Sequence, residues 1–222
     1  MLGLTLGFAA FSNTLTISSS ATVSPALSDF KMVMYGLTDE DDWKISIKEG
    51  APYYTSATFS VPIIGGTDMT APNAIIDNET LTIKNITPSF KEPGSTLWYS
   101  FKVVNEGKYT AYIDKEEVYT IKQTIDSEKQ CIPAEGTTAE YVASACKDID
   151  FVIEFNDTHS NSIASNTPAE NVTSIAIEPN EYVELIIEIT YWHSSTALRA
   201  DGDFNIKFPD IKINFSTVKP EA

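Results

Sequence analysis

The chain is poor in the residue types on which catalytic and nucleic-acid-binding proteins depend. Its 222 residues include two histidines, two cysteines and a single arginine, Arg199, and 15 Lys and Arg stand against 31 Asp and Glu, for a formal net charge of −16. This excess of negative charge repels nucleic acid and anionic membranes, and it leaves cations and basic partners as binding partners. We therefore expect no nucleic-acid partner.

A long apolar run is also missing. Residues 1–9, MLGLTLGFA, are apolar, but polar residues begin at Ser12, well short of the ~20 apolar residues that a spanning helix requires. We expect no transmembrane segment. The small residues Gly7 and Ala9 are typical of the end of a signal sequence and predict cleavage after Ala9. No Lys or Arg precedes Lys31, so the positively charged start of a signal sequence is missing, and we expect residues 1–9 to be only a part of a signal. The alternative is a first strand over residues 4–8.

The only two cysteines, Cys131 and Cys146, have no further Cys and no nearby His that would complete a metal site. In an exported protein such a pair favours a disulfide, and closing a loop of this size contributes about 3 kcal/mol. Thr137 and Glu140 fit a capping box at the start of a helix. The sequence therefore predicts a disulfide-stapled helical insertion over residues 131–146.

Apolar residues alternate with polar ones along most of the chain. Clear examples of this pattern are Leu97, Tyr99, Phe101 and Val103, then Phe204, Ile206 and Phe208, and, after Pro209, Ile211, Ile213 and Phe215. Turn-forming clusters such as residues 77–79, 105–107 and 200–203 separate these runs. Many short strands at this spacing predict an all-β, antiparallel sandwich or barrel, and the length suits a single domain over residues 10–222.

Two segments resemble each other. KEPGSTLWYSFKV, 91–103, and IEPNEYVELIIEI, 177–189, share Glu-Pro, a turn residue at Gly94 or Asn180, and a following apolar alternation. One explanation is that the same kind of turn leads into a strand in each of two sheets. The other is that two unrelated turns resemble each other by coincidence, and we favour the first explanation.

Neither histidine has the context of an enzyme. His159 lies in a polar stretch and His193 follows a predicted strand, and the chain has no H-E-x-x-H motif, whereas catalytic zinc usually takes three protein ligands. No serine has a nucleophile-elbow motif and neither cysteine resembles a nucleophile. We therefore expect no enzymatic activity.

Two acidic runs are candidate calcium sites. Asp39, Asp41 and Asp42 lie in one run, and Asp201 and Asp203 flank Gly202 in the other. Oxygen ligands at this spacing suit calcium, although neither run matches an EF-hand loop. A solvated acidic surface is the alternative that we favour. We expect no other cofactor.

Three segments resemble the TasA and camelysin type of secreted β-sandwich proteins, which include biofilm-matrix fibre subunits. These segments are GFAAFSNTLTISSSATV, 7–23, EPGSTLWYSFKVVNEGKYTAYI, 92–113, and LRADGDFNIKFPDIKINF, 198–215. The resemblance implies a jelly-roll-like β-sandwich, export, and assembly into extracellular fibres through an N-terminal strand donated to the next subunit. Camelysin-like proteins have been classed with metallopeptidases, but the missing zinc motif departs from that activity.

From these features we expect an exported structural subunit of an extracellular fibre or biofilm matrix, with itself as the main partner and glycans or other matrix components as further candidates. Residues 10–23 are the candidate donor strand, with donor residues Phe11, Thr14, Leu15, Thr16, Ile17 and Val23. Main-chain hydrogen bonds to an exposed sheet edge would supply the continuity. The alternatives are pairing of this segment within its own subunit, a monomeric cell-surface module that binds glycan or calcium through the 156–171 loop, and, less favoured, a metallopeptidase.

Overall fold

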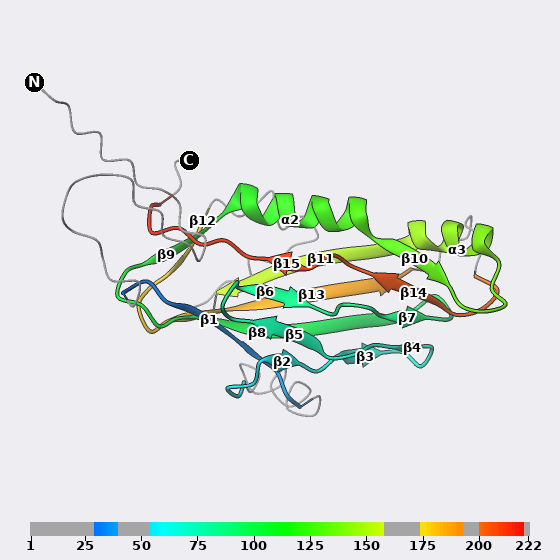
Figure 1. Cartoon of the computed structure of the whole chain (residues 1–222), viewed down its shortest axis with the longest axis horizontal. Helices are drawn as coiled ribbons and strands as arrows, with labels where there is room; N and C mark the ends of the chain where they lie inside the picture. Colours follow the sequence, from blue (N-terminus) through cyan, green and yellow to red (C-terminus); the bar gives the residue numbers. More distant parts are fainter. Residues whose placement is uncertain (1–28, 40–53, 158–173, 193–199, 220–222) are drawn as a thin grey trace, which may run out of the picture.

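The computed structural model describes residues 29–39, 54–157, 174–192 and 200–219. These ranges form two layers of antiparallel sheet with helices along one side (Figure 1). Within them the strands are β1 (Met32–Gly36), β2 (Phe59–Ser60), β3 (Ile63–Gly65), β4 (Met69–Thr70), β5 (Ala74–Asp77), β6 (Thr82–Lys84), β7 (Ser89–Phe90), β8 (Thr96–Asn105), β9 (Ala111–Asp114), β10 (Gln130–Pro133), β11 (Ile149–Asp157), β12 (Ser174–Ile177), β13 (Tyr182–Tyr191), β14 (Phe204–Lys207) and β15 (Ile211–Lys212). The helices are α2 (Lys115–Glu128), α3 (Ala139–Ala145) and the short 3-10 helix η2 (Cys146–Asp148).

The first layer is built on the two longest strands. β8 pairs with β13, β13 pairs with β11, and both β1 and β3 pair with the other edge of β8. Alternate residues of β8, among them Leu97, Tyr99 and Phe101, are fully buried, because successive side chains of a strand point to opposite faces. The alternation in the sequence therefore predicted which face of β8 forms the core.

The two similar segments at 91–103 and 177–189 are neighbours in this layer, so our expectation that they belong to two sheets was wrong. Leu97 lies opposite Ile189 in the register. The shared entry turn is real: Gly94 and Asn180 both have positive φ, at 100° and 66°. The Gly94 N–H donates to the Tyr191 carbonyl at 2.7 Å, and the Asn180 N–H donates to the Asn105 carbonyl at 2.8 Å. Each turn thus binds the end of the other strand.

The second layer continues across a break in its strands. β10, β14, β7 and β4 form one part, and β15, β6, β5 and β2 form the other. Between the two parts, the N–H of Phe208 donates to the Ile86 carbonyl at 3.1 Å. Pro209, which has no N–H to donate, separates β14 from β15. The apolar alternation on either side of Pro209 thus belongs to two short strands, β14 and β15.

At one end of the molecule, β9 and β12 continue the line of β8 and β13. β9 pairs with β12, and Tyr112 also forms a bridge with Ser216. The first described residues lie at this end as well (Figure 1). α3 and β10 lie at the opposite end of the elongated sandwich.

One long side of the sandwich is closed by main-chain hydrogen bonds. The N–H of Gly36 donates to the Ala57 carbonyl at 3.0 Å, and the N–H of Val61 donates to the Leu37 carbonyl at 2.8 Å. A Cβ on Gly36 would lie 1.6 Å from the Phe59 carbonyl oxygen, so only glycine permits this approach. The segment around β2 thereby connects β1 of the first layer to β5 of the second.

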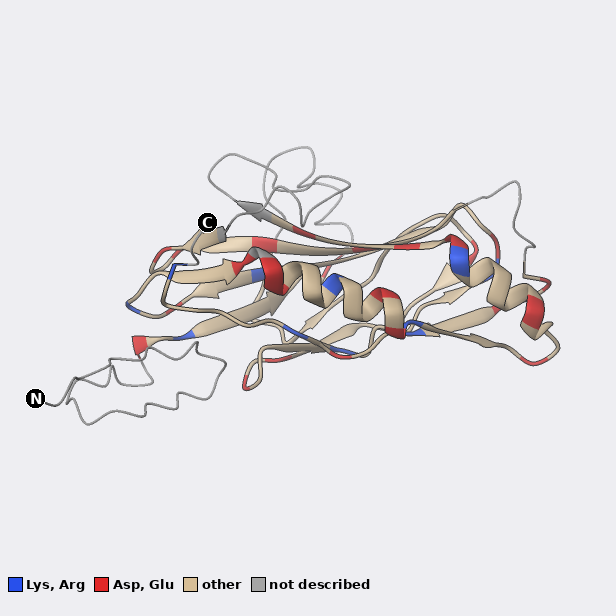
Figure 2. Ribbon diagram, turned by 90° about the horizontal axis from the view of Figure 1, so that it is seen from above, with Lys and Arg blue, Asp and Glu red and all other residues tan. Residues whose placement is uncertain are grey.

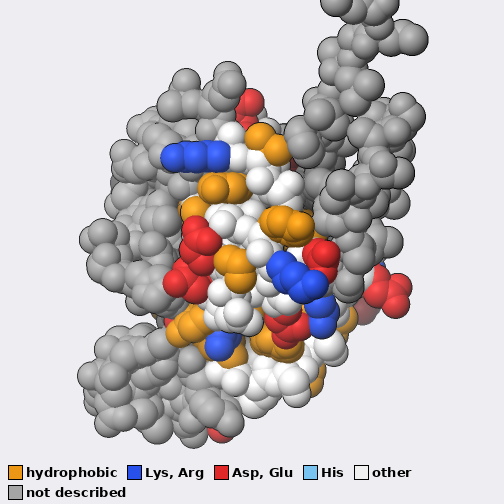
Figure 3. All heavy atoms as spheres, turned by 90° about the vertical axis from the view of Figure 1, so that its left-hand side faces the viewer, with side chains coloured by type: hydrophobic (Ala, Val, Ile, Leu, Met, Phe, Trp, Pro, Cys, Tyr) orange, Lys and Arg blue, Asp and Glu red, His pale blue; other side chains and the backbone are white. Residues whose placement is uncertain are grey.

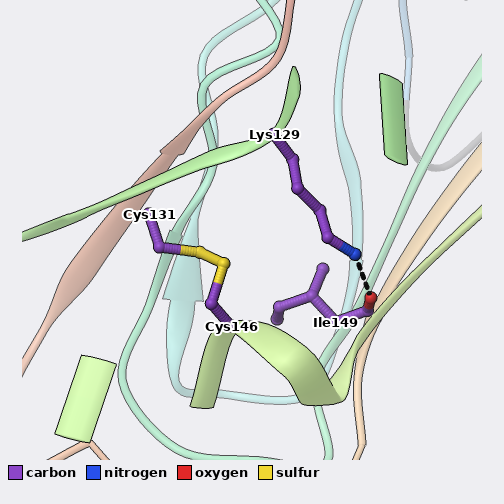
Figure 4. Close-up of a disulfide and its surroundings, with 4 residues drawn as sticks. All are labelled: Lys129, Cys131, Cys146 and Ile149. Carbon is purple, nitrogen blue, oxygen red and sulfur yellow. Dashed lines mark hydrogen bonds between the residues drawn. A yellow bond between two sulfur atoms is a disulfide. The ribbon is translucent and has the colours of Figure 1, made fainter. Parts of the chain in front are cut away.

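The other long side is covered by helices (Figure 2). The predicted disulfide between Cys131 and Cys146 is present, and it joins β10 to η2, just after α3 (Figure 4). The helical insertion at 131–146 is therefore confirmed. α2 was not predicted from the sequence.

The expected capping box at Thr137 and Glu140 does not form. α3 has Thr138 as its N-cap, without a side-chain cap of its own. The Asp201 carboxylate instead accepts hydrogen bonds from the Thr138 N–H at 2.8 Å and hydroxyl at 2.5 Å. The polar groups of the N-cap residue are therefore hydrogen-bonded by a turn far along the chain, because the loop 134–138 packs on the 201–203 turn.

The fold class is confirmed as an all-β, antiparallel, jelly-roll-like sandwich with a short disulfide-stapled helical insertion. Aromatic side chains of both layers form its core: Tyr191 meets Phe90 and Phe204 edge to face, with ring centroids 5.9 and 5.5 Å apart. Such packing stabilises the contact between the layers beyond simple burial.

Candidate assembly surfaces

The donor residues predicted from the sequence, Phe11, Thr14, Leu15, Thr16, Ile17 and Val23, lie outside the described residues, as do residues 1–9. His159, His193, Trp43, Asp41 and Asp42 also lie outside, together with most of the 156–171 loop. The structure therefore tests the surfaces that a donated strand would meet, and not the donor itself.

The acidic turn at 201–203 has a structural role in the described chain. Asp201 caps α3 through Thr138, and these hydrogen bonds lower the pKa of its carboxyl. A Cβ on Gly202 would lie 2.5 Å from the Thr137 hydroxyl, so the turn and the α3 loop fit closely. No group of three Asp, Glu, His or Cys side chains in the described ranges is arranged to hold a metal ion. Calcium binding at either acidic run stays a prediction.

The outer edge of β1 is occupied by a side chain. Asn78 accepts a hydrogen bond from the Met34 N–H at 2.7 Å and donates one to the Met34 carbonyl at 3.0 Å. A neighbouring strand would make the same pair of contacts. Together with the bond from Gly36 to Ala57, Asn78 blocks the addition of a further strand to β1.

The outer edge of β10 is blocked by different means. Ala134 donates its N–H to the Asp203 carbonyl at 2.9 Å. Because residues that bond to the partner strand alternate with residues that face away, the main-chain groups of Cys131 and Pro133 point away from β14. Pro133 has no N–H, and the disulfide holds α3 against this strand. Proline and a covering element are two common protections of an edge strand.

The outer edge of β11 lacks such protection along half of its length. The Trp192 N–H donates to the Asp148 carbonyl at 2.9 Å, and in an antiparallel ladder residues that bond to the partner alternate with residues that face away. The register therefore turns the main-chain groups of residues 149, 151, 153 and 155 away from β13. Lys129 Nζ donates to the Ile149 carbonyl at 3.0 Å, and the Phe151 N–H donates to Asp150 at 2.9 Å. Within the described ranges, no hydrogen bond reaches the outward groups of Ile153 and Phe155.

A gap lies between the edges of β11 and β15, and α2 covers it. We call this gap the lateral seam. Its lining consists of eight apolar residues: Val118 and Ile121 of α2, Ile153 and Phe155 of β11, Leu185 and Ile187 of β13, Ile211 of β15, and Ile213 just after β15. The seam contains about 220 Å³ of unfilled space, open in part to solvent and nowhere wide enough to hold a water molecule. All the side chains that line it are apolar.

Few contacts hold α2 in place. Val118 and Ile125 are buried and Ile121 is half-buried, while Tyr119 is 48% exposed. Asp114 caps the helix by accepting from the Glu116 N–H at 2.8 Å, and Asn214 donates to Glu117 at 2.7 Å. The Asn214 Oδ1 atom is buried with no hydrogen-bond partner. Two buried aliphatic side chains contribute roughly 3–6 kcal/mol to docking before the entropy of ordering the helix is subtracted, so α2 is a weakly held cover.

The start of the described chain is fixed at the β9 and β12 end. The Glu106 N–H donates to the Lys31 carbonyl at 2.8 Å, and the Lys108 N–H donates to the Asp29 carbonyl at 2.7 Å. Glu106 also accepts from Lys31 Nζ at 2.6 Å and from the Tyr35 hydroxyl at 2.5 Å. The latter bond raises the pKa of Tyr35 to about 12, and both partners lower the pKa of Glu106. Asp29, the first described residue, is therefore held at this end of the sandwich.

The surface of that end mixes apolar and charged side chains and does not form a continuous apolar patch. Tyr109 and Val218 are about half exposed there, at 47% and 50%. Figure 3 shows apolar side chains scattered among acidic and basic ones on this face. We therefore find no broad apolar end face among the described residues that would stack subunits by itself.

The outward face of the first layer holds the half-buried carboxyl groups of Glu154 and Glu188. Trp98 donates from Nε1 to Glu188 at 2.9 Å. Burial, and secondarily the charge of Glu188, raises the pKa of Glu154. Trp192, the residue after β13, is 58% exposed.

No protein-family model, curated protein or solved structure matches this chain. The resemblance to secreted fibre proteins therefore stays a prediction from the sequence. Neither described helix is long and apolar enough to span a membrane. The disulfide is typical of an oxidising compartment.

Proposed function

We propose that the chain is an exported structural subunit of an extracellular fibre or matrix, which assembles when the segment at about residues 10–23 adds as a strand to a neighbouring copy. The observation that carries the proposal is the position of Asp29 and Lys31, which are bound at one end of an elongated sandwich. A strand-forming segment upstream of them starts from that end, where it can reach a second subunit.

The protein's composition and chemistry support the same proposal. The described ranges hold no metal cluster, and the disulfide suits an extracellular product. The candidate donor has no charged side chain, so adding it to a neighbour does not increase the repulsion between acidic subunits.

Truncation of the candidate donor tests the proposal. We expect a chain that begins at Ala10 to form filaments in negative-stain electron microscopy, and a chain that begins at Ser24 to remain a folded monomer in sedimentation velocity. Filaments from the shorter chain, or a stable monomer from the longer one at high concentration, would contradict strand donation.

A matched pair of variants separates side-chain docking from loss of chain length. Leu15→Asp with Ile17→Asp places two charges on the apolar face of the segment, whereas Thr14→Asp with Thr16→Asp places them on its other face. We expect only the first pair to abolish filaments. A stable monomer that binds glycan or calcium would instead favour the surface-module alternative, for which exposed Trp192 is a contact candidate.

A further inference from the structure

We propose that the acceptor of the donated strand is the outer edge of β11, and that α2 moves aside from the lateral seam to admit it. The inference rests on the proposed function, and it commits to residues 10–23 of a second copy as the occupant. It names the strand that accepts the donor and the helix that controls access.

A comparison of the sheet edges leads to β11. Asn78 occupies the edge of β1, and Pro133 and the disulfide protect β10. β2 and β4 are two residues long, β3 is three and β12 is four. β11 has nine residues and a single strand partner among the described residues, so it offers the longest edge for pairing.

The main chain of β11 lacks a partner where α2 covers it. The outward N–H and C=O groups of Ile153 and Phe155 belong to residues that are 2% exposed, and within the described ranges no hydrogen bond reaches them. Buried main-chain groups without partners are rare in folded proteins because each one costs free energy. A strand placed beside β11 would satisfy these groups.

The side chains of the seam fit the candidate donor. The seam is lined by aliphatic residues and Phe155. As a strand, the segment would place Leu15, Ile17, Ala21 and Val23 on one face, together with Asn13 and Ser19, and Thr14, Thr16 and Thr22 on the other. Its fourteen residues exceed the nine of β11. The more apolar face can therefore enter the seam while the face with the threonines remains outside.

α2 must shift for this to happen, because the seam is too narrow for water and hence for a strand. The helix is held by buried Val118 and Ile125 and by the hydrogen bond between Asn214 and Glu117. Elements with few buried contacts are the ones that open locally. The donor replaces the apolar contacts that α2 gives up.

Residue-resolved hydrogen exchange tests the acceptor edge with an internal control. In the folded chain that begins at Ser24, we expect the Ile153 and Phe155 amides to exchange at least tenfold faster than those of Val152 and Glu154, which bond to β13. In filaments of the longer chain, we expect the exchange of Ile153 and Phe155 to slow at least a hundredfold. The Val152 and Glu154 amides should be slow in both.

The outcomes distinguish the two proposals. Filaments in which Ile153 and Phe155 still exchange fast, while another edge gains protection, would overturn the β11 acceptor and leave fibre assembly intact. Protection of both amides in a monomer of the longer chain would show that the segment fills its own subunit, which would overturn the second copy as occupant.

A peptide in trans tests the acceptor even when filaments fail to form. A synthetic peptide of residues 10–23, added to the chain that begins at Ser24, should bind and slow exchange at Ile153 and Phe155. The same peptide with Leu15→Asp and Ile17→Asp should not. If the unmodified peptide leaves both amides unprotected at saturating concentration, or does not bind, the β11 acceptor is wrong.

Discussion

At the residue scale, a buried amide side chain organises the turn that follows β8. Asn105 is fully buried. Its Nδ2 donates to the carbonyls of Tyr109 at 2.8 Å and Ile177 at 2.7 Å, and its Oδ1 accepts from the Gly107 N–H at 3.0 Å. All three contacts bind main-chain groups, so the side chain connects the β8 turn to β12.

We expect Asn105→Ala to lower the free energy of unfolding by about 3 kcal/mol, because it leaves buried main-chain groups without partners. Urea denaturation followed by circular dichroism measures the change. Asn205→Ala is the matched control, since Asn205 is exposed on β14, and it should change stability by less than about 0.5 kcal/mol. Equal losses in the two variants would show that the Asn105 network has no special role.

Sequence reasoning located the turn at 105–107 but not the role of Asn105. The missing information is tertiary, because Asn105 and Ile177 are separated by 72 positions. Asn78 and Asn214 show the same limit. Asn78 occupies the β1 edge and Asn214 binds Glu117 of α2, and neither contact is visible in the local sequence. Local pattern identifies the residue type and cannot identify a partner that lies far along the chain.

At the scale of elements, the disulfide fastens the α3 segment to an edge strand. It joins β10 to η2 across a separation of 15 residues, and Lys129, just before β10, donates to the Ile149 carbonyl just after η2. Both connections hold residues 129–149 against the sandwich (Figure 4).

We expect the double variant Cys131→Ser, Cys146→Ser to lose about 3 kcal/mol of stability, since the cross-link no longer restricts the unfolded chain. Thermal unfolding should show a lower melting temperature for the double variant. In limited proteolysis, its loop at 134–138 should become the first site of cleavage. Reductant should produce the same change in the parent chain and no change in the double variant. An unaltered melting temperature and cleavage pattern would contradict this role.

Periodicity predicted strands and their buried faces well, but it could not predict which strands pair. The similar segments at 91–103 and 177–189 therefore turned out to be neighbours in one sheet. α2 was missed although Val118, Ile121 and Ile125 recur at helical spacing behind Asp114, its N-cap. These three apolar residues are few among polar neighbours, and the helix depends on the seam beneath it for most of its stability.

At the scale of the whole molecule, charge opposes association. Each chain carries a formal net charge of −16, and acidic residues are distributed over both helices and several strands (Figure 2). Chains that approach one another therefore repel, and the proposed strand donation would have to overcome that repulsion. Composition alone predicted this property, because net charge does not depend on the fold.

We expect filament assembly of the chain that begins at Ala10 to accelerate at least several-fold between 10 and 150 mM NaCl, because the Debye length falls from about 30 Å to about 8 Å. Light scattering with electron microscopy of the end point measures the rate. The chain that begins at Ser24 should remain monomeric at both salt concentrations. Matching the ionic strength with CaCl₂ and MgCl₂ separates screening from specific calcium binding, since screening predicts equal rates in the two salts. Faster assembly in calcium alone would point to ligands such as Asp39 and Asp41, and a rate that falls with NaCl would show that attraction between charges drives assembly.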